Sequence, residues 1–193
     1  MTLRRVLSLM LCGGLAACAA VTPPAPKAAA PVAATVEWIH PLIDGYGGVH
    51  PNAELPIRPE PDIDYKIFVD VVHVNPDHGQ LADSLDRLAR LVNLMAYAGV
   101  PPEHVHIAAL LDGGAGLLAL TDEAYRKRFK VGNPNLALLH LLKTHGVMLM
   151  LCSQAMAEAN LSQSDFSPDA TVTLSALTDP VVFGQRGYSY VQL

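Results

Sequence analysis

The stretch from residue 66 to residue 76 reads Lys66-Ile67-Phe68-Val69-Asp70-Val71-Val72-His73-Val74-Asn75-Pro76. It is an apolar run rich in β-branched residues, and Asn75-Pro76 ends it with a turn signal. A nearly continuous apolar run of this length is typical of a strand that is covered on both faces, as in a parallel sheet with helices above and below it. The run therefore predicts an α/β protein.

An amphipathic helix follows this strand. Apolar residues recur at spacings of four and three, with polar residues on the opposite side, and Gly99 ends the pattern before Pro101. The apolar positions are Leu81, Leu85, Leu88, Val92 and Met95. Strand and helix together form a first βα unit.

The same alternation continues along the chain. Apolar runs bounded by glycine, proline or asparagine predict strands, and capped segments between them predict helices. We expect further strands over 104–111, 147–152, 170–174 and 188–192, and helices over 121–129, 136–144, 153–160 and 175–185. Strands that alternate with helices imply a largely parallel sheet with helices on both faces.

The helix expected over 136–144 is apolar nearly all round, with five leucines in nine residues. A helix of this kind is either deeply buried or shared with a neighbouring subunit. The pattern favours burial and leaves an oligomer interface as the alternative.

The N-terminus has the plan of a secretory signal peptide. Arg4 and Arg5 precede an apolar run over 6–17, which is too short to cross a hydrocarbon core that needs about 20 residues. Leu15-Ala16-Ala17-Cys18 resembles the bacterial lipobox, in which the cysteine is lipidated and becomes the mature N-terminus. We expect a lipoprotein signal peptide over 1–17 and lipidation of Cys18. The alternative is an ordinary cleaved signal with an accidental cysteine.

Two segments of unusual composition separate this signal from the apolar run at 66–76. Residues 18–36 are rich in alanine and proline, which suits an extended tether. Residues 37–65 hold five prolines and three glycines without helical periodicity, which predicts an arm of turns. The folded domain is then expected over 66–193. In bacterial lipoproteins, an aspartate directly after the lipidated cysteine is associated with retention in the inner membrane. This chain has Ala19 at that position, so by resemblance to such lipoproteins we expect it on the periplasmic face of the outer membrane.

Composition excludes several functional classes. The chain has 193 residues, of which 51% are hydrophobic and 16% charged, and its net charge is −5. The length allows one domain with ancillary segments, the hydrophobic content argues against intrinsic disorder, and the negative charge argues against binding to nucleic acid.

Cys152 is the candidate reactive group. It ends an apolar strand, and Ser153 and Gln154 begin a helix, so it lies where ligands bind in open α/β sheets and where a helix N-terminus favours a thiolate. The alternative is a cysteine packed in the core as a small apolar residue. Gly113 and Gly114 follow the second strand at the same sheet edge, where backbone N–H groups can face an anion.

Other polar residues in the strands have structural explanations. Asp70 and His73 are three residues apart in a strand, so their side chains point to opposite faces and do not form one site. A buried carboxylate without a partner is costly, so we expect Asp70 to be paired with another polar group. His104 and His106 lie on one strand face, but no third ligand stands at a useful spacing, so we expect no metal site.

Several motifs together resemble the DsrE/DsrF-like family, especially its exported branch. The most specific is Asn133-Pro134-Asn135 followed by Gly146-Val147 and Cys152-x-Gln154. The remaining motifs are Gly45 to Val49, Asp122 to Phe129, Ser175 to Thr178, and Gly187-Tyr188. The resemblance implies a three-layer α/β/α fold with a five-stranded, mainly parallel sheet, and a tendency to form homo-oligomers.

The resemblance also implies sulfur chemistry, because relatives carry persulfide on a cysteine, and Cys152 occupies the matching position. Relatives often have a histidine-glycine pair where this chain has Asp112-Gly113. The role of that histidine is therefore not carried over to this chain. We expect a periplasm-facing lipoprotein that binds or relays sulfane sulfur through Cys152, exchanging it with a donor or acceptor protein. Gly113, Gly114, Ser153 and Gln154 would shape the pocket. A cysteine relay needs no cofactor. The alternatives are a non-catalytic oligomeric scaffold with a packed Cys152, and an enzyme that acts on a small sulfur compound.

Overall fold

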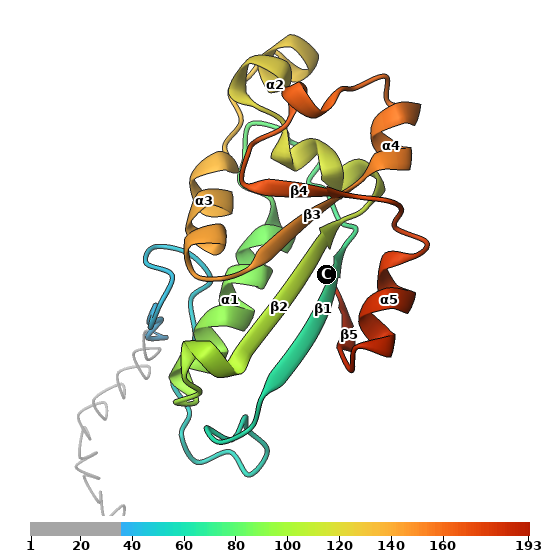
Figure 1. Cartoon of the computed structure of the whole chain (residues 1–193). Helices are drawn as coiled ribbons and strands as arrows, with labels where there is room; N and C mark the ends of the chain where they lie inside the picture. Colours follow the sequence, from blue (N-terminus) through green and yellow to red (C-terminus); the bar gives the residue numbers. More distant parts are fainter. Residues whose placement is uncertain (1–35) are drawn as a thin grey trace, which may run out of the picture. The chain divides into compact units, whose positions relative to one another are not determined.

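A five-stranded, all-parallel sheet is the central element of the computed structural model, which describes residues 36–193 (Figure 1). The strand order is β4-β3-β2-β1-β5. The strands are β1 (Tyr65–Val71), β2 (Val105–Leu111), β3 (Met148–Cys152), β4 (Ala170–Thr173) and β5 (Ser189–Gln192). The predicted α/β class and the five-stranded parallel sheet are confirmed. The predicted signal peptide, Cys18 and the tether up to residue 35 lie outside the described residues.

Five α-helices connect the strands. They are α1 (Asp83–Tyr97), α2 (Asp122–Phe129), α3 (Leu136–Thr144), α4 (Ser153–Glu158) and α5 (Asp179–Gln185). Three short 3-10 helices, η1 (Pro102–His104), η2 (Gly113–Ala119) and η3 (Gln163–Asp165), complete the connections. None of the described helices combines the length and the apolar character that a membrane span requires.

The predicted last helix, 175–185, begins four residues too early. Residues 175–178 form a turn in which the N–H of Thr178 donates to the carbonyl of Ser175 at 2.9 Å. Helix α5 begins at Asp179, and Pro180 follows in its first turn, where a missing N–H removes no helical hydrogen bond.

The two faces of the sheet carry covers of different size (Figure 1). Helices α1 and α3 cover one face, here called the α1 face, where 28 buried hydrophobic residues form one cluster that includes Ile67, Val69 and Ile107. The opposite face, here called the α5 face, is covered by the seven residues of α5. Its buried cluster has five members, Phe68, Ala108, Leu110, Met150 and Phe183. Alternate residues of each strand serve the two clusters, as the pleat of a strand requires.

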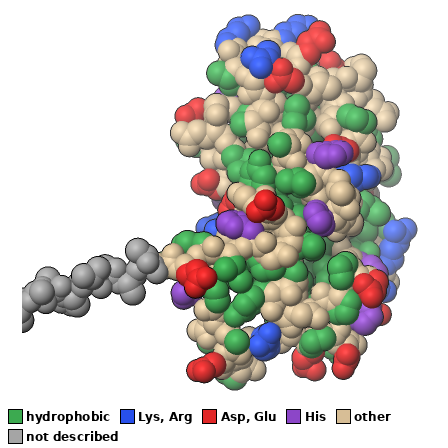
Figure 2. Space-filling model, turned by 90° about the vertical axis from the view of Figure 1, so that its left-hand side faces the viewer, with side chains coloured by type: hydrophobic (Ala, Val, Ile, Leu, Met, Phe, Trp, Pro, Cys, Tyr) green, Lys and Arg blue, Asp and Glu red, His purple; other side chains and the backbone are tan. Residues whose placement is uncertain are grey.

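The leucine side of α3 is buried, in agreement with the favoured interpretation, while His140, Lys143 and Thr144 are exposed. Leu138, Leu139 and Leu142 are fully buried, and Leu136 and Leu141 are partly buried against the same cluster. Figure 2 views the molecule from the side of α3, where apolar side chains alternate with charged and histidine side chains.

The arm predicted over 37–65 contains turns and one isolated bridge, between Ile39 and Val49. It is held against α1 by the fully buried side chain of Asn93. The Oδ1 atom of Asn93 accepts from the N–H groups of Leu42 at 2.9 Å and Ile43 at 2.7 Å, and its Nδ2 atom donates to the carbonyl of Tyr46 at 2.9 Å. One amide side chain thus satisfies several backbone groups of the arm.

Candidate functional site

Cys152 lies at the carboxyl end of β3, an interior strand between β2 and β4. The four residues before it form the strand because they are all apolar, and Ser153 begins α4 directly after it, so Cys152 is also the N-cap of that helix. Its side chain is 5% exposed. Within residues 36–193 it is the one cysteine, and its thiol is free.

Two backbone amides from different segments face the sulfur of Cys152. The N–H of Ala155 in α4 donates to Sγ at 3.5 Å, and the N–H of Ala176 in the connection between β4 and α5 donates at 3.3 Å. Such donors interact best with a sulfur that carries negative charge, because hydrogen bonds to a charged acceptor are stronger than those to a neutral one. The sulfur of Cys152 therefore lies next to two backbone N–H groups in fixed positions, although the residue itself is largely apolar.

Ser153 and Gln154 hold one of these amides in place. The Ser153 hydroxyl donates to the carbonyl of Leu174 at 2.7 Å, and Gln154 Nε2 donates to the same carbonyl at 3.2 Å. Leu174 is two residues before Ala176, so both side chains fix the connection that delivers the second N–H group. Ser153 and Gln154 were predicted to shape the pocket; the cavity described next is lined by other residues, and the two side chains contact the segment that bears Ala176.

A cavity of about 340 Å³ opens beside Cys152. Gly113 and Gly114 line it together with Cys152, as expected from their common sheet edge. Gly113 has a φ of +51°, in the left-handed region that favours glycine, and this turn carries the chain from β2 into η2. The rest of the lining is mostly apolar and includes Leu111, Leu117, Leu151, Met156 and Phe166.

A buried carboxylate beyond the cavity was not recognised in the sequence. Asp179, the first residue of α5, is 7% exposed, and the hydroxyl of Thr173 donates to its Oδ2 at 2.5 Å. Thr173 is the register partner of Cys152 across β3 and β4, so this bond ties the start of α5 to the strand end beside the cysteine. The only sequence signal was the Ser175 to Thr178 motif that precedes it.

Asp70 is buried in β1, and one of its two carboxylate oxygens has a hydrogen-bond partner, whereas Oδ1 is buried without one among the described residues. The hydroxyl of Tyr190 in β5 donates to Asp70 Oδ2 at 2.6 Å. This hydrogen bond, followed by partial burial, raises the pKa of Tyr190 above its usual value. Strand β1 ends at Val71, so His73 lies beyond the strand, and neither Asp70 nor His73 lines the cavity of Cys152.

The two histidines considered as a metal pair lie at the opposite end of the sheet. His104 belongs to η1, and its Nδ1 atom is 3.1 Å from the carbonyl oxygen of Pro61, while His106 is exposed at the start of β2. Within residues 36–193, no group of three or more histidine, cysteine or acidic side chains is arranged to hold a metal ion.

Comparisons with known proteins agree with this architecture. The model of the DsrE/DsrF-like family matches residues 66–193. Among solved structures, a protein of unknown function from Methanobacterium thermoautotrophicum is similar with a TM-score of 0.53 and 16% sequence identity. The match covers 67% of this chain and 100% of that chain, and at this identity it shows a shared fold alone. A comparison with curated proteins found no match.

Proposed function

The chain belongs to the DsrE/DsrF-like family, which is associated with sulfur relay, and from this premise we propose that it carries sulfane sulfur as a persulfide on Cys152. One observation carries the proposal: the Cys152 sulfur accepts from the N–H groups of Ala155 and Ala176 and lines a cavity with Gly113 and Gly114. The family resemblance implies the same residue, and the geometry around its sulfur is a second, independent support.

Loading of the cysteine requires no external oxidant or reductant. The Cys152 thiolate attacks the terminal sulfur of a donor persulfide, a new S–S bond forms on Cys152, and the donor's S–S bond breaks. The electron pair of the broken bond leaves on the donor thiolate, which is released. Delivery to an acceptor thiolate is the same exchange in reverse. The donor or acceptor is a small persulfide or a protein with a reactive cysteine.

The surroundings of Cys152 suit a bound persulfide. The two backbone N–H groups offset negative charge on the sulfur atoms, and the adjacent cavity has room for the added atom. The apolar lining limits the access of water and of competing thiols. Because the thiol itself is 5% exposed, transfer to a protein partner requires that the partner's cysteine enter this cavity.

We also propose the cellular location expected above: a lipoprotein anchored through Cys18, on the periplasmic side of the outer membrane, and assembled as a homo-oligomer. The motif Leu15-Ala16-Ala17-Cys18 supports the anchor. Two or more acyl chains give stable membrane attachment, whereas one chain gives a marginal one.

Intact mass tests the sulfur carrier. The purified chain carrying Cys12→Ala and Cys18→Ala, which lacks the lipid and keeps Cys152 as its single cysteine, is incubated with a sulfane-sulfur donor, and we expect a gain of one sulfur atom. The same chain with Cys152→Ser should gain none. Ser153→Ala is a second test variant: it keeps the thiol but removes one bond to the segment that bears Ala176, so we expect it to accept sulfur more slowly than the parent.

The second candidate function is a non-catalytic scaffold in which Cys152 is a packing residue, and its low exposure favours this reading. A thiol that accepts no sulfur in the folded chain, and reacts with an alkylating reagent only on unfolding, would establish the scaffold and refute the carrier.

Labelling with a radioactive fatty acid tests the anchor. The wild-type chain should take up the label and sediment with membranes, and Cys18→Ala should lose both properties. A labelled Cys18→Ala chain would contradict the lipobox, without bearing on Cys152.

A further inference from the structure

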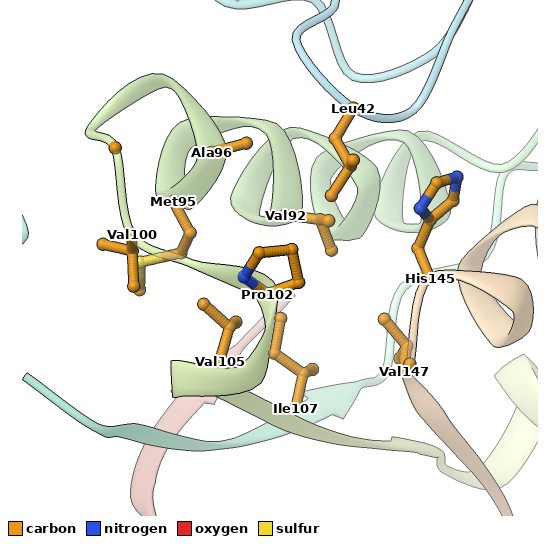
Figure 3. A pocket seen from close by; sticks show the side chains of 12 residues that line it. Leu42, Val92, Met95, Ala96, Val100, Pro102, Val105, Ile107, His145 and Val147 are labelled. Atoms are coloured by element: carbon orange, nitrogen blue, oxygen red, sulfur yellow. The ribbon is translucent and has the colours of Figure 1, made fainter. Parts of the chain in front are cut away.

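The two ends of the sheet differ in the groups that meet there. At the amino ends of β2 and β3, side chains of α1 face Val105, Ile107 and Val147 across a partly open apolar groove (Figure 3). At the carboxyl ends, polar side chains instead bond to the connection between β4 and α5, residues 174–178, whose Ala176 N–H donates to the sulfur of Cys152 at 3.3 Å. The position of this N–H group depends on how the connection is held.

The two N–H groups that face the sulfur are fixed in different ways. Ala155 lies three residues after Cys152, so the first turn of α4 places its N–H. Ala176 is 24 residues from Cys152 in the chain and belongs to no helix or strand. Its methyl group packs on the small cluster of the α5 face, but its neighbours Leu174 and Leu177 are 69% and 86% exposed. Apolar packing of the connection is therefore slight, and hydrogen bonds hold it.

A hydrogen bond to a buried carboxylate closes the connection at its base. Thr173 ends β4 and Asp179 begins α5, and the hydroxyl of Thr173 donates to Asp179 Oδ2 at 2.5 Å. These two residues bracket the connection, with Ala176 midway between them. The N–H of Asp179 also donates to the carbonyl of Ser175 at 3.0 Å. Asp179 thus holds the connection with both its side chain and its backbone.

The bonds at the start of the connection are more open to water. Ser153 and Gln154 both donate to the carbonyl of Leu174, but Ser153 is half-buried and Gln154 is exposed. Water competes with exposed hydrogen bonds, whereas a bond to a buried charged group contributes more. Asp179 is 7% exposed, so its bond with Thr173 is the stronger constraint on the connection.

We propose that Asp179 and Thr173 are positioning residues for sulfur exchange at Cys152, because their bond holds the Ala176 N–H against the sulfur. This inference rests on the proposed function. The exchange itself is unchanged, and the N–H group stabilises the negative charge on the sulfur that attacks or leaves. The alternative is a role limited to the helix, since an acidic residue in the first turn offsets the helix dipole. That role would affect stability and leave the sulfur unaltered.

Sulfur loading of matched threonine variants tests the proposal. The purified chain with Cys12→Ala and Cys18→Ala is incubated with sodium tetrasulfide, and the rate of sulfur gain is followed by intact mass. Thr173→Val keeps the shape and removes the hydroxyl, so it should load about tenfold more slowly, because a hydrogen bond to a charged sulfur is weakened. Thr173→Ser restores the hydroxyl and should load as the parent does. Thr171→Val, the same change at an exposed position of β4, should have no effect.

The pH profile of alkylation separates positioning from stability. Iodoacetamide reacts with the ionised thiol, so loss of the N–H contact should move the midpoint of the rate profile of Thr173→Val about one pH unit upward. Asp179→Ala removes the same bond from the other side, should move the midpoint in the same direction, and replaces Thr173→Val if that variant does not fold. Lower stability in urea with an unchanged profile would overturn the proposal. A downward shift in Asp179→Ala would also overturn it, because the carboxylate would then act through its charge.

The positioning role and the sulfur carrier fail in different ways. A parent chain that gains no sulfur would refute the carrier, whatever the variants do. A parent chain that loads, together with Thr173→Val loading at the same rate, would leave the carrier in place and overturn the role of Thr173 and Asp179.

Discussion

On its α1 face the sheet is covered by two helices and 28 buried hydrophobic residues, whereas on its α5 face a helix of seven residues covers a cluster of five. The strands themselves differ toward the two sides: polar residues such as Asp70, His106 and Tyr190 lie on the α5 face, whereas Val69, Ile107 and Leu149 face the α1 side. The two faces therefore differ in the sheet itself as well as in the helices that cover it. Large apolar side chains consequently stay exposed near α5, among them Leu177 at 86%, Leu174 at 69% and Val181 at 63%.

This comparison indicates how the two faces divide their roles. Buried apolar area is the main source of folding free energy, so the α1 face holds most of the stability. Exposed apolar side chains that lie close together mark surfaces for contact with other molecules. The homo-oligomer proposed above is therefore expected to form through the α5 face.

Truncating one large side chain on each face should give the largest and clearest contrast. Leu88→Ala, at a fully buried position of α1, should lower the free energy of unfolding by about 3–4 kcal/mol, because the dense cluster around it cannot collapse into the space. Phe183→Ala in α5 should cost about 2 kcal/mol, because a short surface helix can relax. Urea denaturation measures both. Equal losses would mean that the small cluster is as strongly coupled to the fold as the large one.

Removing the Asn93 side chain tests whether the arm belongs to the α1 face. Asn93→Ala leaves the buried N–H groups of Leu42 and Ile43 without their acceptor and should cost about 2–3 kcal/mol. The exposed Asn52→Ala in the arm should cost less than about 0.5 kcal/mol. Limited proteolysis is the second measurement. If the arm of Asn93→Ala resists cleavage as well as the arm of the parent chain does, other contacts hold the arm against α1.

On the α5 face, Tyr190→Phe removes the hydrogen bond to Asp70. We expect a loss of about 0.5–1 kcal/mol at pH 7, because Tyr190 is half exposed and water replaces part of the interaction. Tyr188→Phe, for which the described residues show no side-chain hydrogen bond, should have less effect.

The pH dependence of this variant follows from the raised pKa of Tyr190 in the folded chain. The unfolded tyrosine ionises first, at about pH 10, so the stabilisation is complete below that pH and is lost as pH rises through the folded pKa. The parent chain should therefore lose more stability than Tyr190→Phe between pH 10 and pH 11. Parallel profiles in urea denaturation would refute the Asp70 bond.

The smallest effect on stability is expected at Leu177, which is 86% exposed. Leu177→Ser should change the free energy of unfolding by less than about 0.5 kcal/mol but lower the molecular mass measured by light scattering, as an oligomer formed through the α5 face dissociates. Leu94→Ser, at an exposed position of α1, should leave the mass unchanged. The opposite result would place the contact between subunits on the α1 face.

The sequence was most informative about the strands. The runs predicted at 104–111 and 147–152 correspond to β2 and β3 within one residue, because turn residues bound each run on both sides. The start of α5 was misplaced because Ser175 to Thr178 is compatible with a helix, although Pro180 indicated a later start. The unequal cover of the two faces left a trace in the sequence, because Lys66, Asp70 and His106 share one sheet face, but this is seen only once β1 and β2 are placed in register.

The candidate site was predicted in part for a similar reason. Strand and turn patterns placed Cys152 and the Gly113-Gly114 turn at one sheet edge, and they share a cavity. The contact between the N–H of Ala176 and the sulfur could not be predicted from the sequence. Nearly every residue has a backbone N–H group, and only the fold brings this one to the sulfur. The bond between Asp70 and Tyr190 joins residues 120 positions apart, so no local pattern contains it.

The position of β5 in the sheet has a consequence for the order of folding. Strand β1 pairs with β2 on one side and with β5 on the other, so the edge of β1 that receives β5 stays open until residues 189–192 have been synthesised. Contacts across so long a stretch of chain form late, because closing the loop costs entropy before the contact stabilises it. The units β1-α1-β2 and β3 are then expected to assemble first, leaving an apolar strand edge that invites pairing with other chains. Until β5 docks, the open edge of β1 is a place where the chain can pair with other chains and aggregate.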